Sequence, residues 1–176
     1  VIKGGVLGGN KGRGVSVDGG TFRMLGGSLS GIVAADASGA VCVHNGTFEM
    51  SGGEISGNIV CDGGGVYVHD GTFKMSGGKI SGNTTSANGS GGGVYVFQYG
   101  TFEMSGGEIS GNTASNNGGG VCVWACSFTM SGGKISGNTA TSARGGGVHV
   151  YGGGTFEMNG GEISGNKAYF SGNGVN

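Results

Sequence analysis

The sequence predicts an all-β fold: a right-handed, three-faced parallel β-helix, or β-solenoid, with about six coils of 25–28 residues. Three observations favour it. One phrase, GGGV-x-V followed by GTF-x-M-S-GG-x-I-S-G-N, recurs along the 176 residues. Apolar and polar residues alternate within each copy, as in half-buried strands. The chain has 48 glycines and no proline, a composition that suits tight corners and disfavours helices.

The repeat predicts a single domain of stacked coils. We place them at residues 15–40, 41–65, 66–93, 94–120, 121–147 and 148–174, with a partial coil at 1–14 and the start of another at 175–176. Residues 1–10 and 174–176 match parts of the same phrase. We therefore expect a segment of a longer protein, or a subunit whose ends stack on those of a neighbour.

Each coil is expected to contain three strands separated by glycine-rich corners. In the third copy the strands fall at 66–68, 72–75 and 79–81, and the corners at 69–71, 77–78 and 82–93. The last corner carries most of the length variation between copies, so we expect it to bulge outward. Each strand should pair in parallel with its counterpart one coil on, about 4.8 Å away. Parallel crossovers predict a right-handed coil.

Alternation within the strands assigns the core. In the third copy the inward residues are Val66, Val68, Phe73, Met75 and Ile80. Their counterparts should stack in columns of valine, phenylalanine, methionine and isoleucine. The methionine column is predicted to fill core space rather than to bind a metal or cofactor, because methionine commonly packs irregular interiors.

A column of asparagines is expected to form a ladder of side-chain amides from coil to coil. Its members are Asn58, Asn83, Asn112, Asn138 and Asn166. Ile32 takes this position in the first copy and interrupts the column.

Two outward columns carry charges that alternate in sign. They are Glu54, Lys79, Glu108, Lys134, Glu162 and Arg23, Glu49, Lys74, Glu103, Thr129, Glu157. Opposite charges on neighbouring strands attract, so the alternation favours the one-coil register. These columns use every glutamate and leave none as a free catalytic acid. The aspartates are scattered and no catalytic or cofactor-binding motif occurs, so we predict no catalytic residues, no cofactor and no enzyme activity.

Composition limits the partners. Net charge is −1 and 11% of residues are charged, which gives no electrostatic basis for binding nucleic acid. No apolar run approaches the roughly 18 residues of a membrane span, so this segment is not expected to insert into a membrane. The four cysteines show neither disulfide nor zinc spacing, and we expect thiols.

The predicted contact surface lies on the outward side of the first strand. Its residues, expected to form an exposed aromatic stripe, are Tyr67, Tyr95, Phe97, Trp124 and Tyr151. Flat aromatic rings suit sugar faces, other proteins or a sister solenoid. The alternative is that a terminal domain or a long corner covers the stripe.

The sequence favours neither metal binding nor ice binding. His44 and His69 should stack on successive coils near Asp18 and Asp70, a set of ligand types suited to a transition metal. With two histidines and no repeated ligand set, we predict a polar corner and no metal site. A column of threonines suggests ice binding, but threonine is also simply a good strand residue, and a charged column lies beside it.

The segments GTFEMSGG (100–107) and ISGNTASNNGGGV (109–121) resemble repeats of adhesin-like surface proteins of bacteria and some archaea. The second is also similar to repeats of polymorphic autotransporter passengers. Both groups belong to the pectate-lyase-like class of right-handed parallel β-helices. The resemblance implies a secreted or cell-surface protein. It does not imply lyase activity, because the active-site residues of those enzymes have no counterpart here.

We therefore expect a non-enzymatic structural or adhesive segment located outside the cell. Its partners would be copies of itself stacked end to end into fibres, a host or cell-surface protein, or a glycan. The alternative is a β-helix that binds or degrades carbohydrate with its aromatic first-strand face. Ice binding is a minor alternative.

Overall fold

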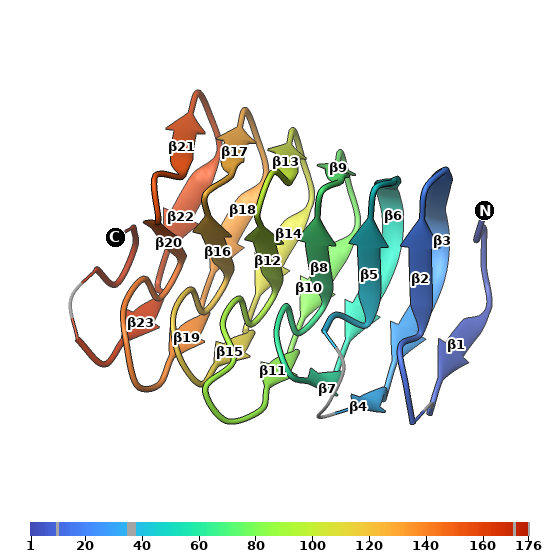
Figure 1. The fold of residues 1–176 in the computed structure, drawn as a ribbon, viewed down its shortest axis with the longest axis horizontal. Helices are drawn as coiled ribbons and strands as arrows, with labels where there is room; N and C mark the ends of the chain where they lie inside the picture. Colours follow the sequence, from blue (N-terminus) through green and yellow to red (C-terminus); the bar gives the residue numbers. More distant parts are fainter. Residues whose placement is uncertain (10, 35–37, 171, 176) are drawn as a thin grey trace.

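The computed structural model describes residues 1–9, 11–34, 38–170 and 172–175, and it contains no helix among them. The chain winds into a parallel β-solenoid of about six turns (Figure 1). In Figure 1 the nearer strands point upward, the more distant ones run back down, and the chain advances from N on the right to C on the left. This sense of winding is right-handed, which confirms the predicted fold class. Asn10 and Asn176, which the repeat assigned to partial coils, lie outside the described residues.

Three parallel sheets run along the solenoid. The first-strand sheet is formed by β2 (Val15–Asp18), β5 (Val41–His44), β8 (Val66–His69), β12 (Val94–Phe97), β16 (Val121–Trp124) and β20 (Val148–Tyr151). The second and largest sheet is formed by β1 (Val6–Gly8), β3 (Thr21–Ser30), β6 (Thr47–Ser56), β9 (Thr72–Met75), β10 (Lys79–Ser81), β13 (Thr101–Met104), β14 (Glu108–Ser110), β17 (Ser127–Met130), β18 (Lys134–Ser136), β21 (Thr155–Met158) and β22 (Glu162–Ser164). The third is formed by β4 (Val33–Ala34), β7 (Ile59–Val60), β11 (Thr84–Thr85), β15 (Thr113–Ala114), β19 (Thr139–Ala140) and β23 (Lys167–Ala168).

The third sheet corrects the expectation of three strands per coil. Its two-residue strands occupy the start of the segment that we had assigned wholly to a corner. Each of these strands directly follows the asparagine position, where side-chain hydrogen bonds hold successive coils in register. It pairs with the equivalent strand of the next coil only over the residues before the loop lengths begin to differ. Conversely, β3 and β6 continue through the Gly-Gly corner that was expected to separate two strands.

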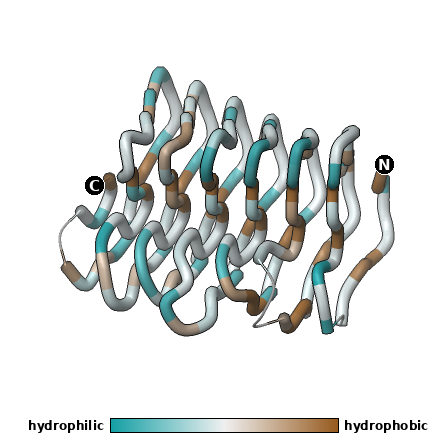
Figure 2. Tube along the Cα trace, in the orientation of Figure 1, coloured by the Kyte–Doolittle hydropathy of each residue, from teal (hydrophilic) through white to brown (hydrophobic). Residues whose placement is uncertain are grey.

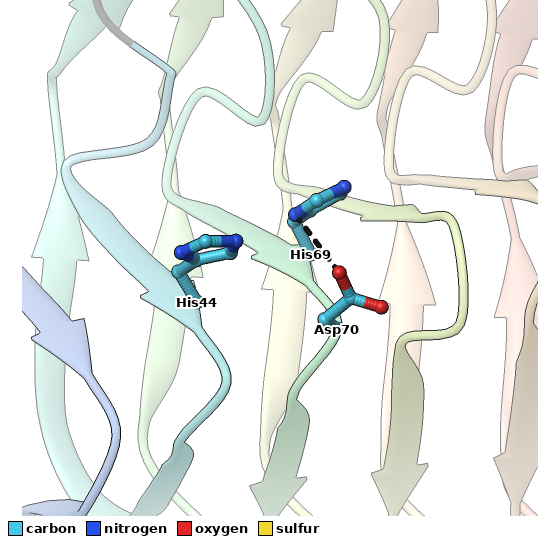
Figure 3. Close-up of side chains that lie close together, drawn as sticks. All are labelled: His44, His69 and Asp70. Atoms are coloured by element: carbon cyan, nitrogen blue, oxygen red, sulfur yellow. Dashed lines mark ion pairs between the residues drawn. The ribbon is translucent and has the colours of Figure 1, made fainter.

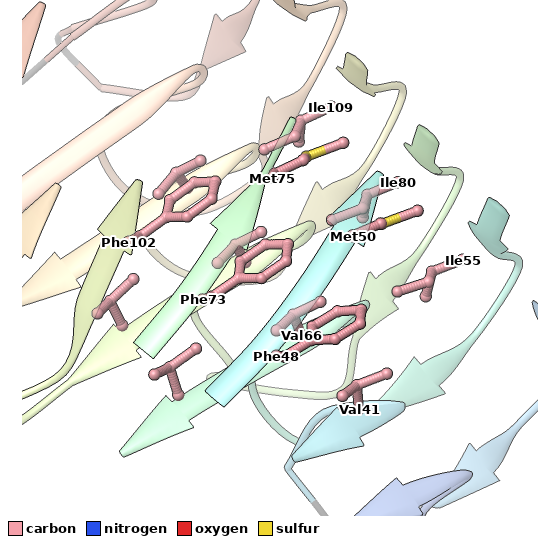
Figure 4. Packing of buried hydrophobic residues seen from close by; sticks show 14 of the residues in the cluster. Val41, Phe48, Met50, Ile55, Val66, Phe73, Met75, Ile80, Phe102 and Ile109 are labelled. Carbon is pink, nitrogen blue, oxygen red and sulfur yellow. The ribbon is translucent and has the colours of Figure 1, made fainter. Parts of the chain in front are cut away.

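The core consists of the predicted columns. Val66, Val68, Phe73, Met75 and Ile80 are all buried. Successive phenylalanine rings from Phe48 to Phe128 stack with centroids 4.5–4.8 Å apart and nearly parallel planes. Figure 4 shows the same side chains repeated from coil to coil, and Figure 2 shows apolar positions recurring at the same place in each turn.

The asparagine ladder is present and buried. Each Oδ1 accepts from both the backbone N–H and the Nδ2 of the asparagine one coil earlier, as in Asn83 to Asn112, where both distances are 3.0 Å. Each Nδ2 also donates to a backbone carbonyl of the preceding coil, that of Leu29 for Asn58 and that of an isoleucine for the others, so that Asn112 reaches Ile80 at 2.9 Å. Ile32 ends the ladder but still donates its backbone N–H to Asn58 Oδ1 at 3.0 Å.

The charged columns pair as their signs predict. Lys74 lies 3.2 Å from Glu103, and Lys79 lies 3.5 Å from Glu108. The Ser110 hydroxyl, together with Lys79, holds the pKa of Glu108 below its ordinary value. These side chains are about half exposed, so their role lies in register more than in stability.

The ladder predicts a large cost for Asn112→Ala. The substitution removes the acceptor of the Asn83 N–H and the donor to the Ile80 carbonyl in a buried site. Each orphaned group costs about 1–3 kcal/mol, so urea unfolding should show a loss of about 3 kcal/mol. Asn116→Ala, in the partly exposed corner of the same coil, is the control and should change stability little. Equal losses in the two variants would contradict the ladder's importance.

The charge columns predict a salt-dependent cost for Lys79→Glu. The variant places like charges directly opposite both Glu54 and Glu108, which is destabilising. Its urea midpoint should fall at low salt and recover at high salt, because salt screens exposed charges. Lys167→Glu faces Thr139 instead and should show no such salt dependence; a matching dependence there would argue against the pairing.

Candidate functional site

A column of aromatic rings runs along the outward side of the first-strand sheet. The aromatic column, as we define it, consists of His44, His69, Phe97, Trp124 and Tyr151. Each is the last residue of its strand, and each lies opposite the next in register. Ring centroids are 5.0, 5.4, 4.6 and 5.6 Å apart in that order. Strand pairing alone brings these rings together, because equivalent residues lie one strand spacing apart.

The predicted stripe is less exposed than expected. Tyr95 is buried, with 6% of its surface exposed, and this part of the prediction is wrong. Tyr67, Phe97, Trp124 and Tyr151 are half-buried. Only half-buried rings are therefore left for contact with a partner.

The glycine corner that precedes each first strand approaches the base of these tyrosine side chains. Gly91, with φ of +67°, lies so close to Tyr95 that an added Cβ would come within 2.7 Å of the tyrosine Cβ. Gly63 approaches Tyr67 in the same way. Glycine is required here both for the left-handed backbone and for the close approach. The rings that pack against Tyr95 are those of Tyr67 and Phe97.

Tyr95 also forms a polar contact across two coils. Its hydroxyl lies 2.9 Å from that of Tyr151, and its ring packs edge-on against Tyr67, with centroids 5.7 Å apart. Burial, followed by the hydrogen bond to Tyr151, raises the pKa of Tyr95. Burial likewise raises the pKa of the Cys122 thiol. Such a thiol stays protonated and is a poor nucleophile.

Histidines and aspartates occupy the N-terminal end of the column (Figure 3). His44, His69 and Asp70 each present one ligand atom, and these atoms all lie within 4.8 Å of one another. Asp18 lies 3.7 Å from His44. The adjoining groove, of about 320 Å³, is lined by Arg13, Ser16, Asp18, Cys42, His44, Tyr67 and His69.

The second sheet carries a larger groove that the sequence did not reveal. It measures about 580 Å³ and is lined by Leu25, Glu49, Met50, Ser51, Lys74, Met75, Ser76, Glu103, Met104, Ser105, Thr129 and Ser131. The repeated Met-Ser pair before the Gly-Gly corner was the available signal, because four copies of that serine line the groove. Lys74 lies between Glu49 and Glu103 in register, so this groove presents no adjacent pair of carboxylates.

None of the four cysteines forms a disulfide, as expected. Within the described residues, no helix has the length and apolar character needed to cross a membrane.

Burial of the first-strand face predicts delayed ionisation of Tyr67. Desolvation is the largest effect and raises its pKa from 10.0 to about 12. The contribution of the protonated Tyr67 hydroxyl to the free energy of unfolding is therefore complete below pH 10 and is lost as pH rises through about 12. When tyrosinate formation is followed by ultraviolet absorbance as pH rises, the Tyr67→Phe variant should lack part of the absorbance change at the high-pH end of the titration. A loss at the low-pH end instead would show that the face is open to water.

No protein-family model, curated protein or solved structure matches this chain. The β-solenoid fold implied by the resemblance to adhesin-like repeats is present in the structure. The adhesin-like identity itself has no support from these comparisons.

Proposed function

We propose that this chain is a non-enzymatic structural and adhesive segment of a secreted or cell-surface protein. It would act as a stiff rod that presents the aromatic column to an extracellular partner. The observation that carries the proposal is the unbroken run of rings over five successive coils, of which His44 is exposed and the other four are half-buried. Aromatic rings with one accessible side are typical of contact surfaces.

Stiffness is supported by ladders that repeat from coil to coil. The phenylalanine stack, the buried asparagine amides and the paired charges each connect neighbouring coils. A solenoid built in this way has mostly nearest-neighbour contacts between coils, so its length grows without a new core. These properties suit a spacer that holds a binding surface away from its point of attachment.

Carbohydrate is the second candidate partner, and the geometry at the C-terminal end of the column favours it. Trp124 and Tyr151 are nearly parallel, with an interplanar angle of 7° and centroids 5.6 Å apart. The indole also packs against the backbone of Gly152, a glycine with φ of +65°. Both rings are thus held in place before binding, which lowers the entropic cost of association.

Trp124→Ala should weaken binding to the partner by about 10-fold or more, because buried tryptophans dominate contact energies. The wild type and the variant would be compared on a glycan array and on immobilised host-surface proteins. The control is Tyr99→Ala, which removes an aromatic ring that is 84% exposed and lies outside the column. Thermal unfolding of both variants would show that the fold persists.

Three results would contradict the proposal. The wild type could bind no glycan and no surface protein, or Trp124→Ala could bind as tightly as the wild type. Release of oligosaccharides from a polysaccharide substrate would instead identify an enzyme and overturn the non-enzymatic assignment.

A further inference from the structure

We propose that His44, His69 and Asp70, with Asp18 beside them, bind a divalent transition-metal ion such as Zn²⁺. The first-strand register places Asp18, His44 and His69 side by side on three consecutive coils. Asp70 follows His69 directly. Imidazole and carboxylate are the ligand types that zinc takes together in proteins. This inference stands independently of the proposed adhesive function.

The distances are close to those of a loaded site. Metal–ligand bonds of about 2.0–2.2 Å place neighbouring ligand atoms about 3.3 Å apart on a tetrahedral ion. Here His69 Nδ1 lies 3.5 Å from Asp70 Oδ2, and His44 Nδ1 lies 3.7 Å from Asp18 Oδ1. The three ligand atoms of His44, His69 and Asp70 lie within 4.8 Å of one another. His44 and His69 stack with an angle of 22° between their ring planes, so the imidazoles must rotate about their side-chain bonds before both lone pairs meet at one ion. The strands already hold the two backbones in register.

Asp70 is supplied by an unusual backbone position. It has φ of +51°, at the corner where Asn45 has +53°, Ala125 has +53° and Gly152 has +65°. Aspartate is among the few residues with a side chain that tolerate this conformation. The Asp70 backbone N–H donates to the carbonyl of Gln98 at 3.1 Å. The corner therefore fixes the point from which this carboxylate reaches the histidine.

Gln98 also selects the nitrogen of His69 that would bind the ion. His69 Nε2 lies 3.4 Å from Gln98 Oε1. A protonated Nε2 donates to this amide oxygen and leaves Nδ1, the nitrogen beside Asp70, with its lone pair available. Ligating histidines characteristically use their second nitrogen in this way. The contact is independent of the ligand distances and points to the same atom.

The surrounding charges favour a cation. Asp18 and Asp70 contribute two carboxylates, which outnumber the one basic side chain, Arg13, in the lining of the adjoining groove. A tetrahedral ion bound by His44, His69 and Asp70 has one coordination position left. Water, Asp18 or a group from a partner molecule would fill it. Mg²⁺ and Ca²⁺ prefer oxygen ligands and should bind this histidine-containing site poorly.

The test is titration of ZnCl₂ into the purified chain, without a histidine tag, followed by calorimetry and by NMR of the imidazole resonances. We expect saturable binding of one ion per chain, with shifts in the His44 and His69 resonances and none in that of His149. The three histidines thus give an internal control in the unmodified protein. MgCl₂ and CaCl₂ should produce neither effect.

Variants then separate ligands from the residue that positions them. His44→Gln and His69→Gln should each weaken Zn²⁺ binding by more than about 10-fold, and Gln98→Ala by about 10-fold. His149→Gln, in the same sheet on β20, should bind as the wild type does. Absence of saturable binding by the wild type overturns the proposal. Binding retained by the double variant His44→Gln/His69→Gln, or shifts centred on His149, overturns it equally.

Discussion

The one-coil register of the parallel strands is the constraint on which every other feature depends. It places Phe73 opposite Phe102, Asn83 next to Asn112 and Lys79 opposite Glu108. Strand pairing sets the repeat at about 4.8 Å, and the phenylalanine centroids follow it at 4.5–5.0 Å. A slip of one residue would turn the apolar side chains outward and break all three ladders together.

The narrow interior is stabilised by apolar columns and one polar column acting together. The asparagine ladder sits at the corner where backbone groups turn into the interior, and its amides supply their partners. Among the described residues, no buried side-chain nitrogen or oxygen lacks a hydrogen bond. Differences in coil length fall mostly in the outer corner, with one added residue also in the corners at 98–100 and 152–154. Added residues cost little there because loop-closure entropy rises slowly with length.

Function on such a scaffold takes the form of rows. Residues at equivalent positions of successive coils lie in a row along the solenoid. In the row formed by the last residues of the first strands, Asp18 and two histidines are followed by Phe97, Trp124 and Tyr151. One end of that row carries imidazole and carboxylate groups, and the other carries larger aromatic rings. Accessibility differs within a row, since Tyr95 is buried and Tyr67 half-buried at equivalent positions.

The sequence by itself determined the fold, the core columns, the asparagine ladder and the charge register, because each is a periodic consequence of one repeated phrase. It also identified the aromatic row and the stacked histidines. The third sheet, the burial of Tyr95 and the second-sheet groove were decided only by tertiary structure. These depend on how neighbouring coils and their corners pack against one another. The contacts of Gln98 with His69 and Asp70 depend likewise on the left-handed corner, since side-chain alternation describes strands and carries no information about corners.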